Sequence, residues 1–344
     1  MADDVIDAAV KNGCRLIEME QKMRKSNGGN PSFIYLYSFP EEEEDLCALE
    51  MRAFFGEHTE TKVLISKEEV EPSRSPFIRG RLEVISEAET ISELAVKAGE
   101  LSLAGGTFKV VYIKYGEQNG GEKIDFQSRR KMEKEIGLQI KGVADLHSPD
   151  SVFGILRLPG RYVLGEYVES ESTWFRHQKK PRQYSTALST RLARAVMNIA
   201  VPVPESSIRV IDPCCGIGTV LVEGLSMGIR IDGSDRNPLV VGGARENIAH
   251  FGLEGEVRVA DIHDIDCHYE VAIVDLPYNL CSVMSDDEKL GILKKSREIA
   301  DKVVVITTEP NDFPLLEAGF SISDRAVVKK GLAGSFTREI IVCN

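Results

Sequence analysis

The sequence lacks a long apolar run, contains few cysteines, and has no two cysteines at the spacing typical of a metal site or a redox motif. None of its hydrophobic stretches approaches the roughly 20 residues that a membrane span needs. The N-terminal residues, MADDVIDAAVKNG, lack the basic-then-apolar order of a secretory signal. The seven cysteines are an odd number, and no two form a CxxC pair, which argues against a disulfide framework or a zinc ribbon. We therefore expect a cytoplasmic protein with no membrane segment and no metal site.

Basic residues are fewer than acidic ones, 42 against 54, but one segment departs from this balance. The net charge of −12 disfavours a general nucleic-acid coat protein. Between Ser172 and Pro204, however, acidic residues are absent. A basic segment in an acidic protein can bind phosphates locally, although a solvated linker and helix face would have the same composition. The candidate phosphate-binding residues are Arg176, Lys179, Lys180, Arg182, Arg191 and Arg194.

The length of 344 residues suggests two or three domains. Residues 1–30 look like a helical lead-in that ends in the breaker SNGGN. Short apolar strands at 33–37, 62–65, 77–85, 107–114, 152–158 and 162–168 then mix with helices at 41–55, 92–103 and 125–140. Short antiparallel strands mixed with helices indicate an α+β region.

After Pro204 the pattern becomes a regular alternation of strands and helices. Apolar β-branched runs without period-2 alternation predict parallel strands that are buried on both faces. They lie at 208–211, 229–232, 257–259, 271–274 and 303–306, and are followed by a hairpin of 320–328 and 336–342. The prediction is an α/β domain with a doubly wound sheet and an antiparallel addition.

A glycine-rich turn follows the first of these strands. The sequence DPCCGIGT starts at Asp212, and its glycines allow a ligand to approach the backbone at a helix N-terminus. A dinucleotide fingerprint needs a small residue at position 221, where this chain has Leu221, so NAD is disfavoured. The chain also lacks the GxxxxGK[ST] motif of a P-loop.

Acidic residues follow the next two strands. Asp235 lies 23 residues past Asp212 and is placed to bind a ribose diol, although a helix-capping role would also explain it. Asp261 is placed to bind the exocyclic amine of an adenine, with a plain loop acid as the alternative.

The fourth strand ends in Asp275-Leu276-Pro277-Tyr278. A carboxylate and a carbonyl beside a flat ring suit an aromatic amine, because hydrogen bonds to both amine hydrogens make the nitrogen more nucleophilic. A strand-end turn would explain Asp-x-Pro alone. All four candidate positions lie where open α/β sheets bind ligands, so the series as a whole favours function.

These motifs carry a family resemblance. DPCCGIGT, GSDRNP, VADIHD and DLPY resemble the successive motifs of class I S-adenosylmethionine-dependent amino-methyltransferases. TFKVVYIK, RRKMEKEIGLQI and KGVADLHSPDSVFGI, which together fall within 107–155, resemble a THUMP domain. RQYSTALSTRLARAVMNIA at 182–200 resembles the segment before the first methyltransferase strand in THUMP-containing tRNA guanine-N2-methyltransferases. That family usually has DPPY, and here Leu276 replaces the first proline.

The resemblance implies S-adenosylmethionine as cofactor, methyl transfer to guanine N2, and tRNA as partner; it leaves a small activating subunit open. Catalysis is expected at Asp275, Leu276, Pro277 and Tyr278. The cofactor-binding residues it implies are Thr186, Asp212, Cys214, Gly216, Gly218, Asp235, Arg236, Asp261 and Ile262.

The resemblance also divides the chain. It implies a helical lead-in (1–30), a ferredoxin-like unit (31–85), a THUMP domain (86–170), a basic linker with a leading helix (171–203) and a seven-stranded Rossmann-like methyltransferase domain (204–344). Two alternatives stay open: an adenine-N6 RNA methyltransferase, which would use the same acceptors, and an RNA-binding protein with a decayed catalytic site.

Overall fold

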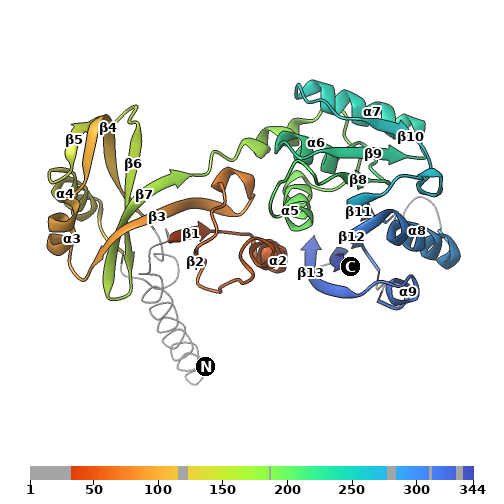
Figure 1. The fold of residues 1–344 in the computed structure, drawn as a ribbon, viewed down its shortest axis with the longest axis horizontal. Helices are drawn as coiled ribbons and strands as arrows, with labels where there is room; N and C mark the ends of the chain where they lie inside the picture. Colours follow the sequence, from red (N-terminus) through yellow and green to blue (C-terminus); the bar gives the residue numbers. More distant parts are fainter. Residues whose placement is uncertain (1–31, 115–122, 186, 277–283, 310–311, 331–335) are drawn as a thin grey trace, which may run out of the picture. The chain divides into compact units, whose positions relative to one another are not determined.

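The computed structural model describes residues 32–114, 123–185, 187–276, 284–309, 312–330 and 336–344. The chain forms two compact units, each built on a seven-stranded sheet (Figure 1). The first unit contains the described residues up to Tyr37, with Glu60–Pro72 and Ile78–Ser170. The second contains Ser38–Thr59, Ser73–Phe77 and Glu171–Asn344. The lead-in predicted at 1–30 lies outside the described residues.

The first unit is an α+β layer whose sheet is mixed. In spatial order its strands are β2 (Val63–Ser66), β1 (Phe33–Tyr37), β3 (Ile78–Ala88), β7 (Arg161–Glu169), β6 (Ser151–Leu158), β4 (Ser102–Ile113) and β5 (Lys141–Ala144). β4 runs parallel to β5 and β6, whereas the other neighbours are antiparallel. The purely antiparallel expectation was therefore wrong for this edge, and β5 was not predicted because its four residues are all exposed.

Two helices, α3 (Ile91–Ala98) and α4 (Phe126–Gly137), share one core with this sheet. Leu94 and Ile136 from the helices pack in the same cluster as Phe108 and Phe153 from the strands. The long strand β3 pairs with β1 on one side and with β7 on the other. Residues 31–85 and 86–170 therefore share one sheet, while the ferredoxin-like and THUMP assignments remain predictions.

The second unit has the doubly wound sheet that the sequence predicted. Its strands, in spatial order, are β10 (Val257–Val259), β9 (Ile231–Asp235), β8 (Val210–Asp212), β11 (Tyr269–Asp275), β12 (Ala300–Thr307), β14 (Phe336–Cys343) and β13 (Ile322–Lys330). The first five are parallel, and β14 is antiparallel to both β12 and β13. Val303–Ile306 are completely buried, as expected for a strand covered on both faces.

Helices and 3₁₀ turns connect these strands. They are η3 (Thr173–Lys179), α5 (Thr190–Ala200), α6 (Thr219–Ser226), α7 (Pro238–His250), η4 (Ile262–Asp264), α8 (Asp286–Ile299) and α9 (Asp312–Glu317). Among the described helices, none is long and apolar enough to cross a membrane.

Helix α2 (Glu44–Phe55), which the sequence assigned to the first unit, packs in the second. Buried Glu50 accepts hydrogen bonds from Ser75 Oγ at 2.5 Å and from Asn198 Nδ2 of α5 at 2.7 Å. Burial raises the pKa of Glu50 to about 7. Arg52 forms a two-point ion pair with Asp324 of β13, both bonds being 2.8 Å long. These contacts explain why residues 38–59 and 73–77 belong to the second unit.

Helix α5 buries the predicted apolar face, but it also buries one of its arginines. Arg194 is only 4% exposed. Its guanidinium donates to Glu223 Oε2 at 3.2 Å, Ser226 Oγ at 2.8 Å and Arg74 O at 2.8 Å. Arg191 instead donates to Glu43 Oε2 at 2.8 Å. The expectation that Arg194 is free for phosphate was therefore wrong, because it is buried among these partners, and Arg191 is paired with Glu43 as Arg182 is with Glu246.

This difference predicts unequal effects of two substitutions on one helix. Arg194→Ala leaves a buried carboxylate without its cation and should lower the free energy of unfolding by roughly 3–5 kcal/mol. Arg191→Ala removes a partly exposed ion pair and should cost about 1 kcal/mol or less. Denaturant unfolding followed by fluorescence of Trp174, the single tryptophan, reports on this unit. Equal losses for the two variants would contradict the assignment.

Candidate active site

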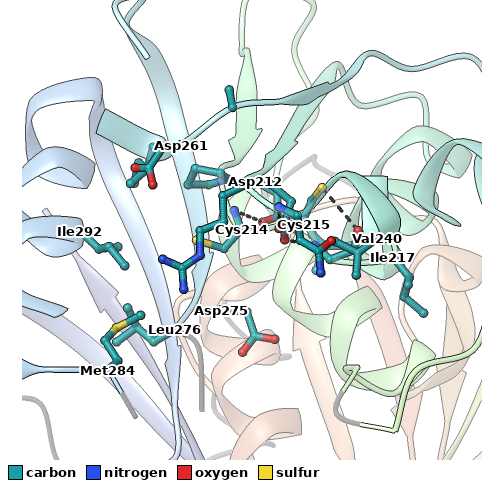
Figure 2. Close-up of a pocket in the computed structure, with 18 of the residues that line it drawn as sticks. Asp212, Cys214, Cys215, Ile217, Val240, Asp261, Asp275, Leu276, Met284 and Ile292 are labelled. Carbon is teal, nitrogen blue, oxygen red and sulfur yellow. Dashed lines mark hydrogen bonds between the residues drawn. The ribbon is translucent and has the colours of Figure 1, made fainter. Parts of the chain in front are cut away.

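A cavity of about 600 Å³ opens at the carboxyl ends of the parallel strands. It is lined by residues that follow β8, β9, β10 and β11, the positions where open α/β sheets bind ligands. Figure 2 shows Leu276, Met284 and Ile292 together on one side, with Ile217 and Val240 on the other. Nine of the predicted site residues line it: Asp212, Cys214, Gly216, Asp235, Arg236, Asp261, Ile262, Asp275 and Leu276.

The two glycines of the turn after β8 have different roles. Both have positive φ, +53° for Gly216 and +74° for Gly218. A Cβ on Gly216 would meet nothing within 4 Å, and this residue lines the cavity. A Cβ on Gly218 would lie 3.0 Å from Ala244 Cβ of α7. Gly218 therefore allows α6 and α7 to come close together, while its approach to the cofactor stays a prediction.

The carboxylate of Asp235 holds this turn in place. Its Oδ2 accepts a hydrogen bond from Gly216 N at 3.0 Å, and its Oδ1 accepts one from Asn237 N at 2.9 Å. The end of β9 is thereby joined to the glycine turn. Each oxygen still has a second lone pair, so the backbone bonds orient the carboxylate without using up its capacity as an acceptor.

Asp261 is organised by the residue two positions after it. Asp261 Oδ1 accepts from His263 N at 3.0 Å and lies 2.6 Å from His263 Nδ1. The hydrogen bond from the His263 backbone, followed by that from its ring, lowers the pKa of Asp261, and Arg236 lowers it further. The Asp261 carboxylate is therefore held in its charged form.

Leu276 contributes in a way that a proline at this position could not. Its side chain is 2% exposed and packs in the cluster that contains Ile262 and Ile292. Its backbone N–H donates to Ile306 O at 2.9 Å, which extends the pairing of β11 with β12. The departure from DPPY therefore keeps a hydrogen bond that proline would lose. Pro277, Tyr278 and Thr186 lie outside the described residues.

The cavity is strongly acidic. Six carboxyl groups line it, from Asp212, Asp235, Asp261, Asp275, Asp287 and Glu288. Among its described lining residues, Arg236 is the only arginine or lysine. Burial, and then the charges of Asp275 and Asp235, raise the pKa of Asp212 well above its usual value. A ligand that carries positive charge would relieve this repulsion.

The cysteines of the turn are poor nucleophiles. Burial raises the pKa of Cys214 and of Cys215, and the neighbouring aspartates raise both further. Thiolates are therefore disfavoured, and the two residues act by their size. Among the residues that the structure describes, no group of three or more His, Cys, Asp or Glu side chains could hold a metal ion.

Several lining residues were not predicted from the sequence. Tyr184, Val240, Met284, Asp287 and Glu288 all border the cavity. Tyr184 lies within the 182–200 segment that carries part of the resemblance, which could have singled it out. Glu288 completes a capping box with Ser285 at the start of α8. That box is a sequence signal for a helix start, but it does not indicate that the helix faces a ligand.

The basic segment is only partly available to phosphate. Arg176 and Lys179 are exposed. Arg182 is also exposed, but it forms a two-point ion pair with Glu246 at 2.6 and 3.0 Å. Lys180 is 8% exposed, and its Nζ donates to Thr190 Oγ1 at 3.4 Å. The phosphate-binding prediction for Lys180 was therefore wrong, as it was for Arg194, because burial keeps a diffusing anion away from both.

Parts of this chain are similar to known proteins. The model of the UPF0020 family, described as an RMKL-like methyltransferase domain, matches residues 177–294. The tRNA (guanine(10)-N2)-dimethyltransferase of Methanothermobacter thermautotrophicus is 26% identical over 279 residues, covering 74% of this chain and 82% of that protein. The enzyme of the same name from Pyrococcus abyssi is 24% identical over 213 residues, covering 58% of this chain and 63% of that protein. TrmN from Thermus thermophilus aligns with 91% of this chain and 99% of its own, at 17% identity and a TM-score of 0.44.

The second unit is therefore a Rossmann-like methyltransferase domain, and its cofactor is S-adenosylmethionine. Residues 177–294 match the UPF0020 methyltransferase model, and the chain is similar to tRNA (guanine(10)-N2)-dimethyltransferases, the kind of protein that its motifs resemble.

The buried Asp212 predicts how stability depends on pH. Because its pKa is raised in the folded state, the folded chain binds this proton more tightly than the unfolded chain does. The Asp212 carboxylate therefore lowers the free energy of unfolding. This loss is absent below about pH 4, grows as the pH rises through the folded-state pKa of Asp212, and is complete above that pKa. Without cofactor, Asp212→Asn should raise the free energy of unfolding by roughly 1–2 kcal/mol at high pH and by nothing near pH 4.

The matched control is Asp287→Asn, which removes an exposed carboxylate from the same cavity. It should change the free energy of unfolding by less than about 0.5 kcal/mol at any pH. Denaturant unfolding between pH 4 and pH 9 measures both variants. A destabilised Asp212→Asn variant at high pH would show that the carboxylate is stabilised in the folded chain rather than strained.

Proposed function

We propose that this protein transfers a methyl group from S-adenosylmethionine to the exocyclic N2 of a guanine in tRNA. The observation that carries the proposal is that one cavity contains both kinds of group that the reaction needs. Asp235 and Asp261 can bind the ribose and adenine of the cofactor, and Asp275 can accept from an amine. Asp235 ends β9, Asp261 follows β10 and Asp275 ends β11, with β8 between β9 and β11 in the same sheet, so the acceptor borders the same cavity as the cofactor groups.

The cofactor fits the charge and shape of the described residues. The open space in front of Gly216 allows close approach to the backbone, and the oriented Asp235 carboxylate suits a ribose diol. Asp212, under repulsion from Asp235 and Asp275, suits the ammonium of the methionine end. When bound, the cofactor supplies an electrophilic methyl group on a positively charged sulfur.

Asp275 is the catalytic residue in this proposal. Its carboxylate accepts a hydrogen bond from the guanine amine and orients the nitrogen towards the methyl group. As the new C–N bond formed, the methyl–sulfur bond of the cofactor would break and leave a neutral thioether; the nitrogen would become positively charged and would then lose a proton to solvent. A fixed carboxylate stabilises that charge mainly in the transition state. The proposed stacking by Tyr278 and the carbonyl role of Leu276 remain predictions.

The proposal for tRNA rests on the relatives and on the first unit. Two curated relatives are named for guanine 10 of tRNA, and we extend that position to this chain. The THUMP assignment for residues 86–170 is a proposal of the same kind, as is action in the cytoplasm. Of the predicted phosphate contacts, Arg176, Lys179 and Arg182 remain, since their side chains are exposed.

A substitution at Asp275 tests the chemical role. Asp275→Ala should lower the turnover of tRNA methylation by about 10²–10³-fold, because it removes transition-state stabilisation. The dissociation constants for cofactor and tRNA should stay within about threefold. The control is Asp301→Ala, which should behave as the parent. Asp301 lies at the amino end of β12, and the cavity lies at the carboxyl ends of the strands. Single-turnover transfer of labelled methyl measures the effect. Parental turnover in Asp275→Ala would remove this residue from the mechanism.

A further inference from the structure

The 3₁₀ helix η3 presents two of its three faces to solvent. With three residues per turn, Trp174, His177 and Lys180 all point inward and are 2%, 8% and 8% exposed. His177 Nδ1 lies 2.7 Å from Glu223 Oε1 of α6, and its ring lies 4.8 Å from the ring of Phe251. These contacts fix the segment on the second unit, so the side chains between the buried ones are held outward.

The outward side chains combine positive charge with an aromatic ring. Phe175 is 57% exposed and lies edge-on to Trp174, with 5.4 Å between their ring centroids. Arg176, Gln178 and Lys179 are exposed beside it. An exposed phenylalanine among basic residues in an acid-free segment is not explained by packing within this unit. Bases stack on such rings while basic side chains meet the phosphates.

The same segment leads to the cavity. Tyr184 is 53% exposed and also lines the cavity, together with Ala187 and Leu188. Its ring therefore borders the space that contains Asp275. The acidic cavity repels phosphates, so an RNA strand can insert a neutral base there only if its backbone is held outside. A stacking ring at the border, followed by cations, meets that requirement.

We propose that Tyr184 and η3 form the binding surface for the nucleotides that flank the methylated guanine. Tyr184 stacks on the neighbouring base at the cavity border, while Phe175, Arg176 and Lys179 bind the strand beyond it. This inference rests on the proposed function, because it takes RNA as the substrate. It adds Tyr184 as a stacking residue that lies outside the motifs proposed to bind the cofactor and the guanine amine.

The test compares substitutions that remove a ring with substitutions that remove charge. Tyr184→Ala should weaken the binding of a tRNA transcript by about five- to a hundredfold. It should leave the salt dependence unchanged, since it removes no charge. Tyr184→Phe, which keeps the ring, should stay within twofold of the parent. The double variant Arg176→Ala, Lys179→Ala should instead flatten the salt dependence. Phe313→Ala, which removes an exposed ring on α9, should bind as the parent.

Binding is measured by fluorescence anisotropy of labelled tRNA over a salt series, and cofactor affinity by calorimetry. The unfolding midpoint reported by Trp174 confirms that each variant is folded. Parental tRNA affinity in Tyr184→Ala would overturn the inference, as would a loss confined to cofactor affinity, which would assign the ring to the cofactor. If Tyr184→Ala weakens tRNA binding but the parent methylates an atom other than guanine N2, this surface stands and the proposed function fails.

Discussion

The site depends on one constraint: the carboxyl ends of the parallel strands all lie on the same side of the sheet. β8, β9, β10 and β11 run in the same direction, so the acids that follow them must share one space. The hydrogen bond from Gly216 N to Asp235 Oδ2 joins the turn after β8 to the end of β9. The cost is electrostatic, because Asp212 is buried beside Asp235 and Asp275 and its pKa rises. A positively charged ligand would relieve this repulsion between carboxylates, and that relief would contribute to its binding free energy.

A second constraint is the buried polar network that completes the catalytic unit. Asn198 of α5 donates to Glu50 of α2, and Arg194 of α5 donates to Glu223 of α6. The carbonyl of Arg74 accepts from both Asn198 and Arg194, so these bonds form one connected set. Glu223 also contacts His177, which fixes η3. The network therefore connects helix α2, contributed from early in the chain, to the segment that we propose binds RNA. Buried polar groups of this kind tolerate little change, because each loss leaves a partner unsatisfied.

Local patterns predicted the strands and the site better than they predicted the network. Buried apolar runs identified β8, β11 and β12, because strands covered on both faces have a simple composition. Acids and glycines at strand ends identified Asp212, Gly216, Asp235, Asp261 and Asp275, which the structure gathers around one cavity.

The failures concern contacts between distant residues. Arg194 looked like a free cation on a helix, but its partner Glu223 lies 29 positions away. The packing of Gly218 on Ala244 has no local signal. Glu50 and Asn198 are 148 positions apart, so no sequence window could show that α2 belongs to the second unit. Strand β5 has no buried residue and therefore no hydrophobic pattern to detect.

The most direct test of the account is to identify the methylated nucleoside. Purified protein is incubated with labelled S-adenosylmethionine and unmodified tRNA. The tRNA is then digested, and the labelled nucleosides are identified by mass spectrometry. The account predicts label in N2-methylguanosine or N2,N2-dimethylguanosine, and its loss in Asp275→Ala. Label in N6-methyladenosine, or cofactor binding with no transfer to any nucleoside, would contradict it.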